Sequence, residues 1–389
     1  MAIIKDIVIT PVAFHDPPLL NSVGVHEPFA LRNIIEVITE TTYGLGESYG
    51  DCVHLDRLTR AAADIKSSSL SIYDTNAIHQ ICVGSLANDT TTGGDGMAGM
   101  VTTASVADKV FSPFEVACLD LQGKLAGVPV SDLLGGRVRD NVQYSAYLFC
   151  KWAGHPGLPD DEYGEALTPE QLVQQAKQII AEYGFKAIKL KGGVLPPEQE
   201  VAAIKALHSA FPTIPLRLDP NAAWTVKTSR WVAKEYLEDP AAEISGLAAV
   251  AKEASMPLAT NMAVVAFSHL PASILQSAVQ TLASICAIWG MRLSVHSNSH
   301  LGISLAAMTH LAAATPNLDY ACDTHWPSAL RWVDGGVEVP RASGSGVELD
   351  REQLRKLHRQ YLECGIRKRD DTAYMRRFRP GFDARIPRW

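Results

Sequence analysis

Hydrophobic and polar residues alternate most regularly in the middle of the chain, over residues 185–193. Ile188 and Leu190 fall on one face of a predicted strand, and Lys189 and Lys191 fall on the other, because side chains alternate between the two faces of a strand. Two neighbouring lysines repel each other, and burying a lysine costs free energy. The lysine face therefore looks either into solvent or into a polar site that uses both charges.

Strand-like and helical patterns alternate along the chain after about residue 140. Apolar residues at helical spacing indicate the helices, and one of these helices opens with a capping box at Thr168-Pro169-Glu170-Gln171. The predicted strands are 142–149, 185–191, 216–221, 236–238, 257–261, 278–280, 291–296 and 318–323. Alternating strand–helix units in this number predict a parallel (β/α)8 barrel.

The first part of the chain has a different pattern, with strands predicted at 3–14 and 34–42 and two helical pieces between 56 and 86. A further helix is predicted to begin at Ser112-Pro113-Phe114-Glu115, because serine suits the cap, proline the first turn and glutamate a capping box. This mixture predicts an α+β unit that is separate from the barrel.

The predicted barrel strands end on polar residues, and catalytic groups of such barrels gather at that end. Asp219, Glu238 and Asn261 come from three successive strands, and their oxygen atoms suit Mg²⁺ better than Zn²⁺. Lys191 and His296 would flank a substrate bound beside them. This arrangement suits the removal of a proton from a carbon next to a carboxylate.

Lys189 would have two effects on that reaction. Together with the metal it would stabilise the enediolate that forms when the proton leaves. Its positive charge would also lower the pKa of Lys191, so that part of Lys191 is a neutral base near pH 7.

Each of these residues also has a simpler interpretation. A lone Lys-x-Lys is most often a solvated edge, a lone Glu-Asp-Pro is usually a turn, and a histidine after an apolar strand is usually a core or rim residue. Their order on consecutive strands of one barrel pattern favours the catalytic interpretation.

Composition and charge limit the binding partners and the cellular compartment that we expect for this protein. The chain has 389 residues and a net charge of −7, and no basic run that would suit nucleic acid. No apolar stretch reaches the roughly 18 residues that a membrane span needs, and the start lacks signal-peptide features. The seven cysteines are scattered without a Cys-x-x-Cys pair, so we expect a cytoplasmic protein with neither zinc site nor disulfide framework.

The polar strand ends and several other segments resemble one known family, the glucarate dehydratases of the enolase superfamily. The segments that carry the resemblance are Lys189-Leu190-Lys191-Gly192-Gly193, residues 218–224, Leu237-Glu238-Asp239-Pro240, residues 259–262, residues 296–300, residues 323–326, Arg369-Asp370-Asp371 and residues 21–29. The resemblance implies a hydro-lyase that uses Mg²⁺ to dehydrate an acid sugar, D-glucarate and often L-idarate, to 5-keto-4-deoxyglucarate. It also implies a modified (β/α)8 barrel, residues 139–345, under an α+β capping domain formed by residues 1–138 and the C-terminal segment 346–389.

The resemblance also implies a role for individual residues. Lys191 is the base on one face of the substrate, His296 is the acid/base on the other, and Lys189 polarises the carboxylate. Asp219, Glu238 and Asn261 hold Mg²⁺. The residues expected to bind the small acid-sugar substrate are His26, Tyr147, Asn221, Asn298, His325, Arg369 and Thr103, or its neighbour Thr102. We expect a homo-oligomer, since barrels of this kind often associate.

Two spacings along the chain are shorter than the roughly 30 residues of a typical barrel unit. One lies between Asp219 and Glu238, and the other lies between Asn261 and His296, where the family carries an aspartate that partners the histidine. No acidic residue occurs between Glu253 and His296. Either residues of the natural chain are missing from this sequence at these points, or the chain has true deletions and His296 lacks its partner.

Other functions remain open at this stage. The same scaffold could act on another aldarate or as an epimerase. One of the two lysines could instead form a Schiff base, as in barrel aldolases. A relative that has lost its aspartate could be catalytically impaired and serve as a binding subunit.

Overall fold

The computed structural model describes residues 2–87, 89, 106–232, 237–241, 243–254, 258–260, 286–287, 292–325 and 330–389. The predicted site residues Asn261 and Thr103 lie outside the described residues, and so does Thr102. The same holds for the predicted strand 278–280 and for both junctions with short spacing, at 235–236 and 280–281.

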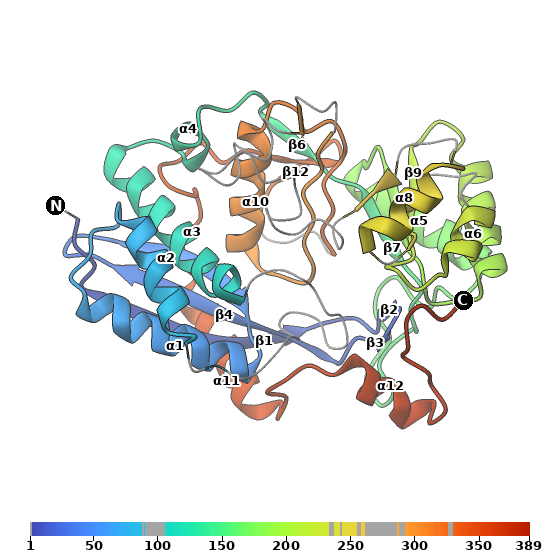
Figure 1. Cartoon of the computed structure of the whole chain (residues 1–389), viewed down its shortest axis with the longest axis horizontal. Coiled ribbons are helices and arrows are strands. Elements are labelled where there is room, and N and C mark those ends of the chain that lie inside the picture. The colour runs from blue at the N-terminus through green and yellow to red at the C-terminus, as the bar shows by residue number, and fades with distance from the viewer. Residues whose placement is uncertain are drawn as a thin grey trace.

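The N-terminal part of the chain is built on an antiparallel sheet of order β1-β4-β5, formed by Asp6–His15, Phe29–Ile38 and Tyr43–Tyr49. Ile35 and Val37 pack under the helices on one face, whereas Ile34 packs on the other face against α11, because neighbouring residues alternate between the faces. The helices on this sheet are α1 (Cys52–Ser67), α2 (Thr75–Gly84), α3 (Val106–Ala126) and α11 (Arg351–Glu363). Figure 1 shows α1, α2 and α3 in blue to teal beside the sheet.

Helix α3 corrects one prediction. It already includes residue 106, so Ser112 does not cap it, and Pro113 lies inside the helix. A proline there removes the hydrogen bond to the carbonyl of Lys109. The hydroxyl of Ser112 donates to that carbonyl at 3.4 Å instead, so the carbonyl keeps a hydrogen-bond partner.

The second part of the chain carries a parallel sheet of order β11-β10-β9-β8-β7. Its strands are β7 (Ala146–Phe149), β8 (Ile188–Lys191), β9 (Leu216–Asp219), β10 (Leu237–Glu238) and β11 (Leu258–Ala259). Parallel bridges join Tyr144 to Cys322, Leu293 to Leu318 and His296 to Asp323, so the two last predicted strands continue the sheet beyond β7. This is the strand order of the predicted modified (β/α)8 barrel.

The helices that follow these strands are α5 (Pro169–Tyr183), α6 (Pro197–Ala210), α7 (Val226–Val232), α8 (Glu243–Ala251) and α10 (Gly302–Ala314). The predicted capping box of α5 is present, with Thr168 accepting from the Gln171 amide and Gln171 bonding back. Gly184 ends α5 in the left-handed conformation, and β8 starts at Ile188. Only residues 185–187 therefore connect the Gly184 cap to the lysine strand.

The C-terminal segment returns to the N-terminal part of the chain (Figure 1). Arg351 of α11 pairs with Glu36 of β4, and Asp371, the first residue of α12 (Asp371–Phe378), accepts from Asn21 at 2.8 Å. Asn21 belongs to a hairpin of β2 (Leu20–Asn21) and β3 (Gly24–Val25). The division at residues 138 and 345 stays a prediction.

Three short strands and one short helix complete the described secondary structure. Strand β6 (Asn141–Gln143) pairs with β13 (Gly336–Glu338), which also pairs with β12 (Trp332–Val333), and α4 (Val130–Leu133) follows α3. Among the helices that the structure describes, none is long and apolar enough to cross a membrane.

Candidate active site

Both lysines of β8 point into the barrel. Lys189 is 0% exposed and Lys191 is 4% exposed. Lys191 Nζ donates to Asp219 Oδ2 at 2.9 Å, and Lys189 Nζ donates to Glu238 Oε1 at 2.9 Å. The solvated-edge interpretation of the two lysines is therefore wrong, and the strand ends that carry Lys191, Asp219 and Glu238 meet as the sequence predicted.

The lysine strand ends where it does because of the turn that follows. Gly193 has a φ of +72°, and a Cβ there would lie 2.3 Å from the Pro220 carbonyl oxygen. Only glycine fits a left-handed residue at such a close approach. This contact holds the end of β8 against the loop after β9, and hence Lys191 beside Asp219.

Two residues that the sequence did not single out for a role, Arg217 and Asp323, complete the charge cluster in the barrel. Asp323 accepts from Lys189 Nζ at 3.2 Å and from Arg217 Nη2 at 2.7 and 2.8 Å. Arg217 Nη1 also lies 3.3 Å from Glu238 Oε2. Three cations thus face three carboxylates, because buried charges require partners of opposite sign. The alternation of side chains along β9 predicts that Arg217 shares the face of Asp219, although it gives Arg217 no role.

Lys189 lowers the pKa of Lys191 as the sequence predicted, but a neighbouring carboxylate reverses the net direction. Burial alone would lower the pKa of Lys191, as Lys189 also does, but the carboxylate of Asp219 outweighs both effects and the pKa is raised. The pKa of Lys189 is raised well above its usual range, because the carboxylates of Asp323, Glu238 and Asp219 outweigh its burial. The sequence showed the neighbouring lysine but not the distance to the carboxylates.

A cluster of carboxylates at the ends of β9 and β10 has the composition of a metal site. Single oxygens of Asp219, Glu238 and Asp239 lie within 4.8 Å of one another, and all three side chains are buried. Carboxylate oxygens without sulfur or nitrogen ligands suit Mg²⁺. These residues therefore fit the predicted metal, with Asp239 as a further candidate that sequence reasoning missed.

The backbone around this cluster is bent to bring the carboxylates together. Asn221, Ala222 and Asp239 all have positive φ values, of 55°, 58° and 44°, which cost free energy for residues other than glycine. Asn221 donates its backbone amide to Asp219 Oδ1 at 3.0 Å, and the Ala222 amide donates to the Asp239 carbonyl at 2.9 Å. The predicted substrate residue Asn221 is thus next to Asp219, and its buried Oδ1 has no hydrogen-bond partner among the described residues.

A carboxylate lies near His296, but it is not the aspartate that the family resemblance implied between Asn261 and His296. Its Nδ1 lies 3.8 Å from Asp323 Oδ2, on a strand that pairs with its own. This is an ion-pair distance and is too long for a hydrogen bond. Burial and the charge of Lys189 lower the pKa of His296, and Asp323 acts in the opposite direction. Within the described part of the chain, Asp323 is therefore the candidate partner of His296.

Aromatic rings form a wall that continues from the lysines toward the N-terminal hairpin. Lys189 Nζ lies 4.8 Å from the centroid of the Tyr147 ring, which is 5.7 Å from His296 and 5.4 Å from His325. The His325 ring stacks on His26 at 5.6 Å. The structure thus brings the predicted residues Tyr147, His325 and His26 together with the catalytic candidates. Burial raises the pKa of Tyr147 to about 12, so this ring is neutral near pH 7.

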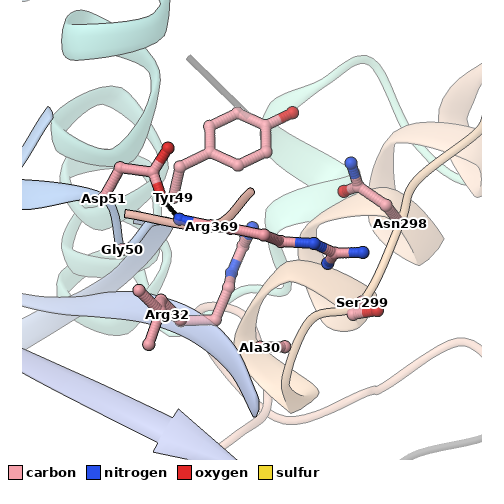
Figure 2. A pocket seen from close by; sticks show the side chains of 9 residues that line it. Ala30, Arg32, Tyr49, Gly50, Asp51, Asn298, Ser299 and Arg369 are labelled. Atoms are coloured by element: carbon pink, nitrogen blue, oxygen red, sulfur yellow. Dashed lines mark hydrogen bonds between the residues drawn. The ribbon is translucent and has the colours of Figure 1, made fainter. Parts of the chain in front are cut away.

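Arg369 and Asn298 line a separate small cavity of about 20 Å³, together with Ser299 and the ends of β4 and β5. Figure 2 shows the guanidinium of Arg369 reaching toward Asn298 and Ser299. Arg369 is 8% exposed and binds Asp371 through two hydrogen bonds of 2.7 and 3.0 Å. A cavity of this size holds one water-sized polar group, such as one oxygen of a substrate.

Glu200, on α6, holds the turn that follows the lysine strand. Its carboxylate accepts from the backbone amides of Gly193, Val194 and Leu195 at 3.0, 2.8 and 3.0 Å. Burial raises the pKa of Glu200 to about 7, although these amides lower it. The sequence contained no signal for this contact, because it depends on how α6 packs against the turn.

The raised pKa of Glu200 predicts a pH-dependent stability. The folded state binds this proton more tightly than the unfolded state, whose pKa is near the usual 4.5. The free energy of unfolding, relative to Glu200→Gln, is therefore expected to be largest below pH 4.5 and to fall by about 3 kcal/mol as the pH rises through 7. Urea denaturation at several pH values measures the difference. Glu198→Gln, an exposed neighbour on α6, is the control, and a difference that does not change with pH would contradict the prediction.

Comparisons with known proteins agree with this geometry. A family model described as Enolase C-terminal domain-like matches residues 171–283 and 276–353. A Streptomyces coelicolor protein named a probable glucarate dehydratase is 44% identical over 422 residues, which cover 98% of this chain and 97% of that protein. Because this alignment is longer than the 389 residues of the chain, the relative has segments that this chain lacks, consistent with the short spacings.

Solved structures of similar sequence share the whole architecture. An enolase from Gibberella zeae, complexed with magnesium, formate and sulfate, is 73% identical and has a TM-score of 0.95, covering 100% of this chain and 98% of that one. An enolase from Pseudomonas fluorescens with bound magnesium, potassium and tartrate is 45% identical, with a TM-score of 0.92 and 100% coverage of both chains.

Proposed function

The chain belongs to the glucarate dehydratase family of the enolase superfamily, and from this premise we propose that it is a hydro-lyase that dehydrates an acid sugar with the help of Mg²⁺. The proposed substrates are D-glucarate and L-idarate, and the product is 5-keto-4-deoxyglucarate. The observation that carries the proposal is a buried cluster of charges: Lys191 contacts Asp219, Lys189 contacts Glu238, and Asp323 lies beside both Lys189 and His296.

In the proposed reaction, His296 or Lys191 removes the proton from the carbon next to one carboxylate of the substrate. Lys191 does so only in its neutral form, after its own proton has left, and Asp219 opposes that loss in the free protein. The electron pair of that C–H bond moves into the carboxylate, and Lys189 donates a hydrogen bond to the negative charge that develops there. The hydroxyl on the adjacent carbon then leaves with a proton as water. The resulting enol becomes the ketone of the product when a proton is added to the carbon that lost the hydroxyl.

A bound Mg²⁺ would supply Lewis-acid stabilisation of the negative charge on the substrate carboxylate. The residues that would hold the ion are Asp219 and Glu238, with Asp239 or Asn261 as a third oxygen ligand. Support comes from the oxygen-only donor set and its burial.

Two proton-transfer groups explain why a pair of diastereomers is proposed. D-glucarate and L-idarate differ in configuration at the carbon that loses its proton. With Lys191 proposed on one face and His296 on the other, one group meets the proton of each diastereomer. The polar lining formed by Asn221, His26 and His325 suits a polyol diacid, which has many hydroxyl groups and little apolar surface.

The test is turnover by the purified protein with Mg²⁺ and a panel of hexarates and hexonates, followed by detection of the keto acid. We expect 5-keto-4-deoxyglucarate from both D-glucarate and L-idarate. If only a different aldarate is turned over, the protein is a related dehydratase with another substrate. Exchange of the substrate proton without loss of water would indicate an epimerase. If no acid sugar reacts, the protein is the impaired relative, although Asp323 beside His296 favours an active enzyme.

The remaining expectations accompany this function. We propose a cytoplasmic enzyme that acts on a small molecule and forms a homo-oligomer. We also propose that residues 1–138 and 346–389 form the cap over a barrel of residues 139–345, supported by the pairing of Arg351 with Glu36 and of Asn21 with Asp371.

A further inference from the structure

Asp16 is a buried carboxylate that has no role in the chemistry described so far. It follows β1 directly and is 1% exposed. Its Oδ2 lies 2.9 Å from His26 Nδ1 and 3.2 Å from Arg369 Nη1, and its Oδ1 accepts from Ser299 Oγ at 3.0 Å. Burial would raise the pKa of Asp16, but His26 and Arg369 hold it below the usual range. Asp16 is therefore ionised and acts only as an acceptor.

The acceptor role of Asp16 determines where the protons of two histidines lie. His26 Nδ1 must donate to Asp16. Ser299 also gives its only proton to Asp16, so its oxygen must accept from His325 Nδ1, which lies 3.1 Å away. Both rings then carry a proton on Nδ1, as is usual when a carboxylate orients an imidazole from behind.

The opposite nitrogen of His26 is available for a ligand. Its Nε2 is buried and has no hydrogen-bond partner among the described residues. The ring stacks on His325, which contacts Tyr147, and Lys189 lies over Tyr147. A buried nitrogen without a partner costs free energy, which a ligand hydroxyl would offset.

We propose that Asp16 is the positioning residue for the substrate-binding wall of the site, and that it holds His26 and His325 with Nε2 toward the hydroxyl groups of a polyol diacid. The same carboxylate fixes Arg369, whose guanidinium reaches toward Asn298 and Ser299 (Figure 2). One residue thus aligns groups from the N-terminal hairpin, the barrel loops and the C-terminal segment. This inference rests on the proposed function for the identity of the ligand.

The Asp16→Asn variant tests the proposal in kinetics. An amide that turns its NH₂ group to His26 Nδ1 selects the opposite tautomer, and Arg369 loses a charged partner. We expect the KM for D-glucarate to rise by about 10- to 100-fold, since one to two charged hydrogen bonds are lost, while kcat changes by less than about 3-fold. Ser299→Ala removes only the link to His325, and we expect a KM increase of about 3- to 10-fold.

The matched control is Glu36→Gln. Glu36, on β4, is also a buried carboxylate, and it pairs with Arg351 of the C-terminal segment at 2.5 Å. We expect its KM to stay at the wild-type value even if its Tm falls. A merely structural role for Asp16 would lower Tm and the active fraction but leave KM unchanged, and that outcome in Asp16→Asn and Ser299→Ala would overturn the proposal.

A second measurement does not depend on turnover. In protein labelled with ¹⁵N-histidine, the spectrum of His26 reports which ring nitrogen carries the proton, and His26→Gln assigns its signals. We expect Nδ1 to be protonated in the wild type and this pattern to change in Asp16→Asn. A wild-type His26 without a proton on Nδ1 would refute the role of Asp16, whereas absence of acid-sugar turnover alone would refute only the proposed function.

Discussion

Replacing His296 by asparagine or Lys191 by alanine is expected to lower kcat for D-glucarate by about 10²- to 10⁴-fold, the range that general acid–base catalysis contributes. We propose that the two side chains act on opposite faces of the substrate, so that neither replaces the other. Steady-state kinetics with a keto-acid assay measures the loss. Circular dichroism and Tm of each variant show that the fold is intact.

The two variants should also differ from each other. Each variant loses the proton-transfer group on one face and keeps the group on the other. In D₂O, His296→Asn is therefore expected to exchange the substrate proton of one diastereomer only, and Lys191→Ala that of the other. Proton NMR of recovered D-glucarate and L-idarate distinguishes them.

Matched controls come from the same residue types outside the site. His208 is exposed on α6 and Lys186 is exposed just before β8, so His208→Asn and Lys186→Ala should retain wild-type kcat. If Lys191→Ala and His296→Asn both retained activity, the assigned chemistry would be wrong. A product trapped on Lys191 or Lys189 by borohydride would instead favour the Schiff-base mechanism.

Strands β8, β9 and β10 were predictable because each ends on a charged residue. The alternation at 185–191 placed Lys189 and Lys191 on one face, and the parity of β9 placed Arg217 and Asp219 on the same side as each other. Neighbouring parallel strands place their carboxyl ends side by side, and this is why Lys191 lies beside Asp219. The start of α3 could not be predicted in this way, because a capping pattern around Pro113 is also compatible with a helix that began earlier.

The parts of the site that sequence reasoning missed depend on contacts between distant segments. Asp16 meets Arg369 across the N-terminal and C-terminal parts of the chain, and Asp323 meets His296 across two paired strands. The separation of these residues along the sequence indicates neither contact. The effect of Asp219 on the pKa of Lys191 was missed for the same reason, since a charge 2.9 Å away outweighs a neighbour two residues along the strand.

Removal of divalent cations is expected to lower the rate by about 10³-fold or more, because Lewis-acid stabilisation of the substrate charge is worth several kcal/mol. Dialysis against EDTA followed by an assay with and without added Mg²⁺ measures this effect. We expect Mg²⁺ to restore activity in the wild type. Asp219→Asn should stay inactive at any Mg²⁺ concentration, because it removes a charged oxygen from the cluster with Glu238 and Asp239.

A thermal shift separates metal binding from catalysis. A ligand that binds only the folded state raises Tm, and the rise grows with the logarithm of the ligand concentration above its Kd. Mg²⁺ should therefore raise the Tm of the wild type and of Asp319→Asn but not that of Asp219→Asn. Asp319 is a surface carboxylate that pairs with Arg292 and lies outside the cluster. Full activity after EDTA would exclude a metal role for Asp219 and Glu238. In that case the lysines alone would have to stabilise the enediolate, and Lys189→Met would be the more damaging change.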